Sequence, residues 1–370
     1  MKVVVAPDKF KGSVTAVEAA DAIALGVLDA LPDASVVRCP VADGGEGTLD
    51  VLAAAGAEIV SVRVSGPLGT PVDATYAVLD GCAYVESARA CGIEFVTPSP
   101  SVSLQANTYG VGELIAHALS RGVGRLVLTV GGTASTDGGA GMLQALGAQV
   151  LDGSDAPIGL GGGPLREVSE VDLTAVLTRL SGIQIGVATD VTNPLLGPSG
   201  AAAVFGPQKG ASPEEVAELE EALTAWARAL HVIGADVADI PGSGAGGGIA
   251  AAALALGASV ESGFDLIVGL TGVESALDGA DLVITGEGSL DPQSLLGKAP
   301  AGIARRAKGI PLLAIAGRIA LDSSQLASLG VVGSRALIDH APSLEYALAN
   351  TPALLRAQAA DLVRTWASTT

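Results

Sequence analysis

The sequence predicts an α/β protein in which one domain, built around a parallel sheet, is formed from both ends of the chain. Short apolar runs alternate with helical patterns near the N-terminus, and the same alternation returns toward the C-terminus. The middle of the chain instead holds short alternating segments separated by Gly, Pro and Asp-Gly turns, which are typical of antiparallel strands. At 370 residues the chain also exceeds the ~250–300 residues that one hydrophobic core organises. We therefore expect residues 1–66 and 259–370 to form the parallel domain and residues 67–258 to form an inserted domain of mixed α/β structure.

The N-terminal segment has the order strand, loop, helix. Residues 1–6 predict a buried strand, and Thr15 and Glu18 form a capping box that begins a helix. A second strand at residues 35–39 is followed by a glycine-rich turn and a helix at residues 49–55. This order is typical of a parallel α/β sheet.

The middle segment contains strands of two kinds. Antiparallel strands are expected at residues 58–64, 72–79 and 83–86, and buried strands at residues 126–130 and 183–188. A glycine-rich loop and a helix at residues 140–146 follow the first buried strand. Ser212, Pro213 and Glu215 supply the N-cap, N1 and N3 residues of a long amphipathic helix.

The C-terminal segment returns to the α/β pattern. After the glycine-rich run at residues 242–248 and an alanine-rich helix, strands are expected at residues 282–285, 312–316 and 334–338. Helices alternate with these strands, and the last helix covers residues 354–366. If the two chain ends share one sheet, the functional site is expected in the cleft between the two domains.

Composition excludes several classes of protein. A hydrophobic content of 49% excludes disorder, yet the longest apolar runs fall short of the ~20 residues that span a bilayer. The apolar run at residues 3–6 is too short for a secretory signal, and the three widely spaced cysteines do not suggest a disulfide framework. We expect a soluble cytoplasmic protein.

The net charge of −19 argues against binding to nucleic acid or to an anionic membrane, because both require a cationic surface. An anionic small molecule would have to be bound by a few local positive groups, such as lysines, helix N-termini or a metal ion.

Glycine-rich loops and scarce lysines together suggest where those positive groups lie. The chain has 50 glycines, many in loops between a strand and a helix, where backbone N–H groups can face an anion. Only six lysines occur against 14 arginines, and four of them lie in glycine-containing loops or at a helix start: Lys9, Lys11, Lys209 and Lys298. A lysine next to a glycine suits phosphate, although a solvated loop charge explains it almost as well.

Acidic residues accompany these lysines in strand-end loops: Asp8, Asp43, Glu46, Asp137, Asp190, Glu287 and Asp291. One or two of them could bind Mg²⁺, and one could orient or deprotonate a hydroxyl that attacks a phosphate. A single Asp in a turn is more often there for its own backbone hydrogen bonds, so only the convergence of several is informative.

Standard nucleotide and catalytic motifs are missing. No Gly-x-x-x-x-Gly-Lys-Ser/Thr occurs, because Ala299 follows Lys298. The run at residues 242–247 matches Gly-x-Gly-x-x-Gly, but Pro241 precedes it where a dinucleotide fold has a buried strand. The three histidines lack triad or metal spacing and are interpreted as structural.

Six ordered motifs resemble the bacterial glycerate kinase family over nearly the whole chain. They are residues 6–13 (APDKFKGS), 42–48 (ADGGEGT), 131–142 (GGTASTDGGAGM), 190–195 (DVTNPL), 205–210 (FGPQKG) and 285–288 (TGEG) followed by Asp291, Gln293, Gly297 and Lys298. The sequence departs from the family pattern at three positions, where Lys9, Ser289 and Ser294 stand in place of the frequent Ser, Arg and Thr.

The resemblance implies ATP- and Mg²⁺-dependent phosphorylation of glycerate, most often at the 2-position, within glyoxylate-linked organic-acid metabolism. It also implies two α/β domains, one of them Rossmann- or flavodoxin-like. Catalytic roles are expected among Asp190, Lys11, Asp43, Asp137 and Lys209, and metal binding among Asp190, Glu287 and Asp291. Asp190, at a strand end, is the first choice for metal binding or hydroxyl activation, with Asp43 and Asp137 as rivals.

The remaining expected site residues fall into two groups. Substrate or phosphate binding is expected at Lys9, Ser13, Gly44, Gly45, Glu46, Gly131, Gly132, Thr133, Ser135, Gly138, Gly139, Asn193 and Gln208. Nucleotide binding is expected at Gly286, Glu287, Gly288, Asp291, Gln293 and Lys298.

Two alternative functions stay open on the sequence: an NAD(P)-dependent hydroxy-acid oxidoreductase, and a non-catalytic sensor of small carboxylates. The missing strand before Gly242 argues against the first, and consumption of ATP would separate the second from a kinase. The expected partners are D-glycerate and ATP, without nucleic acid or membrane, in a monomer or homodimer.

Overall fold

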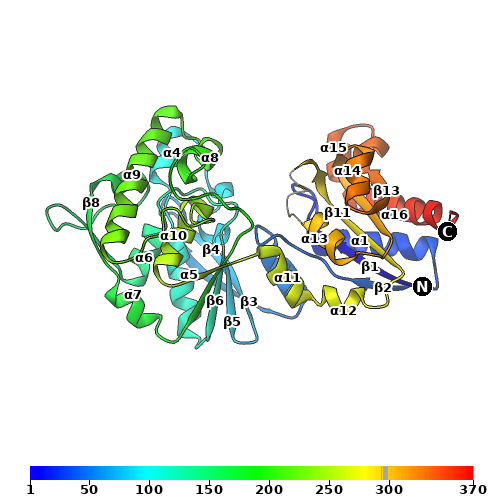
Figure 1. Cartoon of the computed structure of the whole chain (residues 1–370), viewed down its shortest axis with the longest axis horizontal. Coiled ribbons are helices and arrows are strands. Elements are labelled where there is room, and N and C mark those ends of the chain that lie inside the picture. Colours follow the sequence, from blue (N-terminus) through cyan, green and yellow to red (C-terminus); the bar gives the residue numbers. More distant parts are fainter. Residues whose placement is uncertain (293, 295–298, 370) are drawn as a thin grey trace. The chain divides into compact units, whose positions relative to one another are not determined.

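The computed structural model describes residues 1–292, 294 and 299–369 (Figure 1). The chain folds into two compact units. The first unit contains Met1–Asp43, Asp50–Ala55 and Gly263–Thr370, and the second contains Gly44–Leu49 and Gly56–Ser262. Each unit is built around its own sheet.

The first unit has a five-stranded parallel sheet with the order β13-β12-β11-β1-β2. Its strands are β1 (Lys2–Pro7), β2 (Ser35–Arg38), β11 (Leu282–Leu290), β12 (Leu312–Ile319) and β13 (Val331–Ala336). Renumbered within the unit, the order from β2 to β13 is 2-1-3-4-5, which is the doubly wound order of the flavodoxin-like fold. Such sheets bind ligands at the carboxyl ends of the strands, where the order reverses, here between β1 and β11.

Helices cover both faces of this sheet because its strands are apolar on both sides. Val3 and Val5 of β1 belong to one core cluster and Val4 and Ala6 to another. The helices of the unit are α1 (Ala16–Ala30), α2 (Thr48–Ala54) from Asp50 onward, α11 (Gly263–Thr271), α12 (Val273–Leu277), α13 (Ala299–Arg306), α14 (Ser323–Ser328), α15 (Leu344–Ala349) and α16 (Thr351–Ala367), with the 3₁₀ turn η6 (Leu337–His340). Figure 1 shows α1 and α16 side by side, and a Cβ on Gly26 of α1 would lie 2.2 Å from the carbonyl oxygen of Arg356.

The second unit has a six-stranded mixed sheet with the order β10-β9-β6-β5-β4-β3. Its strands are β3 (Glu58–Ser65), β4 (Pro71–Leu79), β5 (Cys82–Glu86), β6 (Arg125–Thr129), β9 (Gln184–Ala188) and β10 (Ser259–Glu261), and β7 (Gln149–Asp152) and β8 (Val168–Asp172) form a separate antiparallel pair. Neighbours from β5 to β10 are parallel, whereas β4 is antiparallel to both β3 and β5.

Helices and 3₁₀ turns complete the second unit. The helices are α3 (Ala88–Cys91), α4 (Pro100–Gln105), α5 (Tyr109–Ser120), α6 (Ala140–Leu146), α7 (Thr174–Arg179), α8 (Ala201–Phe205), α9 (Pro213–Val232) and α10 (Ile249–Ala255). The 3₁₀ turns are η1 (Ile93–Phe95), η2 (Gly163–Glu167), η3 (Pro207–Lys209) and η4 (Ala245–Gly247). Helix α9 begins at the capping box of Ser212 and Glu215, and its Trp226 is fully buried in the core.

The α/β fold class is confirmed, including the parallel sheet shared by the two chain ends, since β1 pairs with β11. The expected boundaries differ from the observed ones. The second unit takes in residues from Gly56 rather than 67, because β3 pairs along its whole length with β4. It ends at Ser262 rather than 258, because β10 pairs with β9.

Among the described residues, no helix combines the length and the apolar character that crossing a membrane requires.

Candidate active site

Three parallel strands of the second unit end side by side at the candidate site. Glu86, the last residue of β5, is in register with Thr129 of β6, which is in register with Ala188 of β9. The loops that follow these strands therefore start at one edge of the sheet. Two of the loops carry expected site residues, at 131–139 and 190–193.

Glu86 ties the segment Gly44–Leu49 to this edge. Its carboxylate is buried and accepts hydrogen bonds from the backbone N–H groups of Gly47 (3.3 Å) and Leu49 (3.4 Å). Its Oε1 also lies 3.6 Å from Nε of Arg89, whose side chain is 33% exposed. Neither Glu86 nor Arg89 was predicted from the sequence. The available signal was a carboxylate directly after the apolar run Ala83–Val85.

The two glycine motifs of the second unit meet here, which brings together four of the expected residues. A Cβ on Gly131 would lie only 3.1 Å from Cα of Gly45. Thr48 Oγ1 donates to the carbonyl of Gly45 (2.7 Å) and fixes this turn. Gly44 is buried beside them, whereas Gly132 is exposed and Gly131 half-buried, so the first two residues of the 131–139 loop are open to solvent.

Asp137 anchors the loop from inside. It is fully buried, and its carboxylate accepts hydrogen bonds from Thr108 N (2.8 Å), Thr108 Oγ1 (2.7 Å), Gly139 N (3.1 Å) and Gly141 N (3.3 Å). Burial raises the pKa of Asp137, and these hydrogen bonds oppose the rise. With four donors on two oxygens, the carboxylate is directed at the loop backbone rather than at solvent.

Lys209 also supports this loop from beneath. Its side chain ends in the protein interior, with the residue 3% exposed, and Nζ donates to the carbonyl of Ser135 (2.5 Å) and to Thr133 Oγ1 (3.5 Å). Burial lowers the pKa of Lys209 to about 8, while the nearby Asp137 carboxylate acts in the opposite direction. The structure therefore places Lys209, Thr133 and Ser135 in one buried network, not on a surface that a substrate could reach.

Gly138 and Gly139 are needed for packing. Both have positive φ, of 62° and 75°. A Cβ on Gly138 would lie 2.5 Å from Trp226 Cδ1, and one on Gly139 would lie 2.5 Å from Cβ of Ala252. They allow close approach to α9 and α10, which differs from the approach to a phosphate that the sequence suggested.

The residues after β9 have mixed exposure. Asp190 is exposed, whereas Asn193 is half-buried and donates through Nδ2 to the carbonyl of Ser199 (2.8 Å). Gln208 is exposed on η3. Of this group, Asp190 and Gln208 have side chains that solvent reaches freely.

The glycine-rich run at residues 242–248 packs beneath the same loops. Gly247 accepts a hydrogen bond from Gly138 N (3.0 Å), and Gly244 N donates to the carbonyl of Asn193 (3.0 Å). It contains the 3₁₀ turn η4 rather than a strand-to-helix turn of a dinucleotide fold.

In the first unit, acidic residues gather at the carboxyl edge of the parallel sheet. Asp8 follows β1, and its N–H donates to the carbonyl of Gly286 on β11 (2.8 Å). Burial raises the pKa of Asp8 to about 7; the negative charges of Asp43 and Glu287 add to the rise, and Lys9 opposes it. Asp8 was expected only as one of the carboxylates in strand-end loops, without a role of its own.

Glu287 and Asp291 share one serine. Ser294 Oγ donates to Glu287, and the backbone N–H of Ser294 donates to Asp291 Oδ1 (3.3 Å). The expected nucleotide-binding residues Gln293 and Lys298 lie outside the described residues.

These carboxylates fit Mg²⁺ in chemical type, since Mg²⁺ prefers oxygen ligands. In the described part of the chain, no group of three or more Asp, Glu, His or Cys side chains is arranged to hold a metal. Mg²⁺ commonly binds through one or two carboxylates, completed by water and substrate phosphates, and Glu287 with Asp291 could supply such a pair.

Several expected anion-binding groups of the first unit are engaged within the protein. Ser13 Oγ donates to the carbonyl of Leu348 (3.1 Å) and to Thr351 Oγ1, which pins the β1–α1 loop to the α15–α16 region. The N-terminus of α1 is closed by its own Thr15 and Glu18. Lys11, in contrast, is exposed.

Gly286 and Gly288 allow close packing at and beside the parallel sheet. A Cβ on Gly286 would lie 2.0 Å from the carbonyl oxygen of Ile315, and one on Gly288 would lie 3.2 Å from the backbone nitrogen of Lys11. Their small size lets the strands and the β1–α1 loop approach closely.

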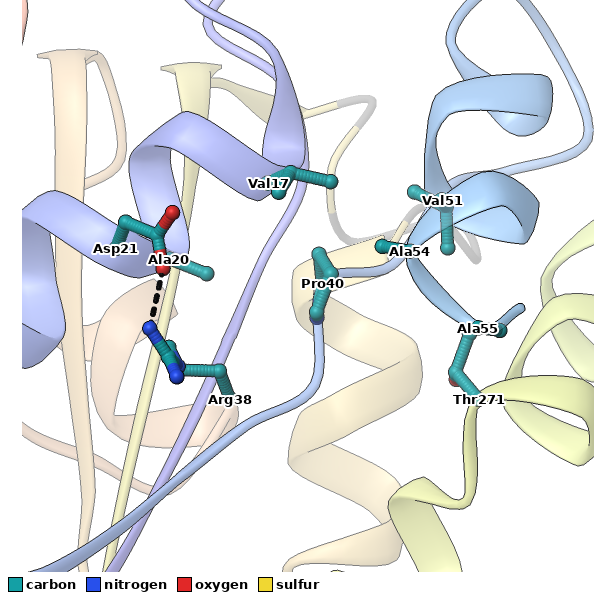
Figure 2. A pocket seen from close by; sticks show the side chains of 9 residues that line it. All are labelled: Val17, Ala20, Asp21, Arg38, Pro40, Val51, Ala54, Ala55 and Thr271. Atoms are coloured by element: carbon teal, nitrogen blue, oxygen red, sulfur yellow. Dashed lines mark hydrogen bonds and ion pairs between the residues drawn. The ribbon is translucent and has the colours of Figure 1, made fainter.

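Figure 2 shows a separate hollow of about 390 Å³ in the first unit, between α1, the end of α2 and Thr271. Arg38 points at Asp21 across it, with Nη1 2.7 Å from Oδ1, so the two charges neutralise each other. Apolar residues such as Val17 and Val51 form much of the remaining wall. None of the expected site residues that the structure describes lines this hollow.

Comparison with known proteins identifies the family of the chain that carries these loops. The model of the glycerate kinase family matches residues 3–367. The chain belongs to the glycerate kinase family. It is 41% identical over 369 residues to the glycerate kinase of Bacillus subtilis, covering 98% of this chain and 97% of that protein. It is 45% identical over 333 residues to the glycerate 2-kinase of Escherichia coli, covering 87% and 86%.

A solved structure agrees with this assignment. The chain is similar to a crystal structure assigned as glycerate kinase 2 from Salmonella typhimurium LT2, with a TM-score of 0.85 and 40% identity, covering 100% of this chain and 99% of that one. The resemblance drawn from the six motifs is thereby confirmed, and the protein is a kinase. Membership of a kinase family implies ATP as the phosphate donor.

Proposed function

We propose that this glycerate kinase family member transfers the terminal phosphoryl group of ATP to the 2-hydroxyl of D-glycerate in a Mg²⁺-dependent reaction. The observation that carries the proposal is the 45% identity over 333 residues to a relative named glycerate 2-kinase. We further propose that the enzyme is cytoplasmic and acts in glyoxylate-linked organic-acid metabolism. We expect it to be a monomer or a homodimer.

The carboxyl edge of β5, β6 and β9 supports a site for a small anion. Arg89 contributes a cation at this edge, and a guanidinium can pair with a carboxylate through two parallel hydrogen bonds. We assign it to the carboxylate of glycerate. Gly45, Gly131 and Gly132 would leave room for the substrate to approach the backbone. The catalytic role expected for Lys209 is less well supported, because its ammonium is buried under the loop.

The acidic residues divide by exposure. Asp190 is exposed at the end of β9 and stays the first choice for orienting or deprotonating the attacking hydroxyl, with Asp43 as its rival. Asp137 fits a positioning role, because its four hydrogen bonds are all to the protein. Glu287 and Asp291 would hold Mg²⁺, which when bound neutralises charge on the transferring phosphoryl group. Phosphoryl transfer depends mainly on such positioning and charge.

An ADP-release assay tests the proposal. D-glycerate should release ADP with Mg²⁺ and ATP, whereas lactate, which lacks the 3-hydroxyl, and L-glycerate serve as controls. A sensor would bind D-glycerate without releasing ADP, and an oxidoreductase would change nicotinamide absorbance instead. The absence of ADP release with D-glycerate would refute the proposal.

A further inference from the structure

A pocket of about 360 Å³ lies at the carboxyl edge of the parallel sheet in the first unit. Four adjacent strands contribute to it. Phe10 follows β1, Gly288 belongs to β11, Arg318 lies near the end of β12, and Ile338 follows β13. Three of these strands, β1, β11 and β13, are labelled in Figure 1, and β1 and β11 form the pair at which the strand order reverses. Open α/β sheets bind ligands at this position.

The walls of the pocket are mostly apolar. Phe10, Leu337 and Ala347 are buried side chains that face it. Leu344 and Leu348 of α15 also line it, although they are 63% and 42% exposed. Exposed aliphatic side chains beside an apolar hollow are typical of a surface that a ligand covers. The pocket is of a size that holds a small organic molecule.

Two of the glycines that line the pocket, Gly288 and Gly317, lie against each other. A Cβ on Gly317 would lie 2.5 Å from the carbonyl oxygen of Gly288, so the ends of β11 and β12 run close together without side chains between them.

The pocket also carries two cations, Lys11 and Arg318. Both are exposed, and within the described part of the chain neither forms an ion pair with an acidic side chain. In a chain with 39 acidic and 20 basic residues, two unpaired cations beside one apolar hollow indicate an anionic ligand. A nucleotide combines these two features, because its base can pack on an apolar wall and its phosphates are anionic.

We infer that this pocket binds the nucleoside of the phosphate donor, with its base against the apolar wall and its phosphates toward Lys11 and Arg318. The inference rests on the ATP dependence proposed above. Lys11 was expected among the catalytic residues, and Arg318 was given no role. Among the described residues, Gly288 is the one expected nucleotide-binding residue that lines the pocket.

A larger hollow of about 650 Å³ at the opposite edge of the sheet provides a control. It contains Arg305 and Lys308 and lies at the amino ends of β12 and β13. Because nucleotides bind at the carboxyl ends of such strands, removal of a charge here should not affect nucleotide binding.

Titration calorimetry with ADP and with inorganic tripolyphosphate, which has no nucleoside, tests the inference. Ala347→Phe should fill the pocket and weaken ADP binding by roughly 10-fold or more, and leave tripolyphosphate binding unchanged. Arg318→Ala should weaken both probes by roughly 10-fold, since it removes one charge-assisted hydrogen bond. The control Lys308→Ala should change neither.

A second variant keeps the inference testable if Ala347→Phe does not fold. Leu344→Asp alters the same wall at an exposed position and should weaken ADP binding without loading the core. Circular dichroism should show that each variant is folded. Folded Ala347→Phe and Leu344→Asp that bind ADP like the wild type would overturn the pocket while leaving the proposed function intact. A wild type that neither binds ADP nor phosphorylates glycerate would overturn the proposed function, and this inference with it.

Discussion

Replacement of Asp8 by asparagine should stabilise the first unit, and the effect should grow as the pH rises. The aspartate is buried at the end of β1, near the negative charges of Asp43 and Glu287. Asparagine has nearly the same shape and keeps an oxygen that can accept the hydrogen bond from the N–H of Lys9 (2.6 Å). The substitution therefore removes the buried charge with little change in contacts.

The magnitude follows from the pKa. Burial raises the pKa of Asp8 from 3.8 to about 7, so the folded protein retains a proton that the unfolded chain has lost. Stability consequently falls as the pH rises through this interval and levels off above about pH 7. At ~1.36 kcal/mol for each pH unit, the loss is about 4 kcal/mol. Asp8→Asn avoids it, so the variant should be as stable as the wild type at about pH 4 and more stable by up to about 4 kcal/mol at about pH 8.

The assay is urea denaturation at several pH values, with EDTA present so that bound metal does not alter the carboxylates. The two tryptophans lie in different units, Trp226 in the second and Trp366 in the first. A Trp226→Phe background therefore lets fluorescence follow the first unit alone.

Asp29→Asn is the matched control, because it makes the same chemical change in the same unit. Asp29 is paired with Arg356 (2.6 Å), and this hydrogen bond lowers its pKa. Its stabilisation is present above its ordinary pKa and is lost as the pH falls, which is the opposite trend. If Asp8→Asn and wild type differed by the same amount at all pH values, the assignment of a raised pKa to Asp8 would be refuted.

Three further predictions concern the second unit. Gly138→Ala should destabilise it by about 2–4 kcal/mol, because φ is positive at this position and the new Cβ would lie 2.5 Å from Trp226. The control Gly257→Ala, where φ is also positive but nothing lies within 4 Å, should lower the free energy of unfolding by less. Equal losses of stability in urea denaturation would argue against the contact with Trp226. Lys209→Met should lower kcat roughly 10-fold with a smaller change in KM for glycerate, because it loosens a loop rather than a substrate contact; a rise in KM alone would indicate direct substrate binding. Asp190→Asn should lower kcat by roughly 100-fold or more without a change in the urea midpoint, and near-normal turnover would exclude it as the catalytic base or metal ligand.

Much of the fold could be predicted because local patterns determine it. The capping boxes at Thr15 and Ser212 gave the starts of α1 and α9, and short apolar runs gave β1, β6 and β9. The compact units have other bounds than the expected domains, because the strand periodicity of residues 58–64 does not show with which strand this segment pairs. The partner, β4, follows in sequence and carries β3 into the second sheet.

The candidate site was predictable where glycine-rich backbone forms it, and less predictable where the burial of a side chain determines its role. The meeting of Gly45 and Gly131 follows from two loops rich in glycine. The sequence gives no sign that Lys209 is covered, because a lysine before a glycine looks the same on a surface loop and beneath one. Glu86 was not predicted as a site residue because no glycine or lysine lies beside it in the sequence. Only its position at the end of β5 shows that it belongs to the site.

Phosphorus NMR of the product formed from ATP and D-glycerate tests the central claim most directly. The account predicts one new phosphomonoester signal, matching 2-phosphoglycerate, that grows in step with ADP. A signal matching 3-phosphoglycerate would contradict the proposed position of transfer, and the absence of any phosphorylated glycerate would contradict the proposed function itself.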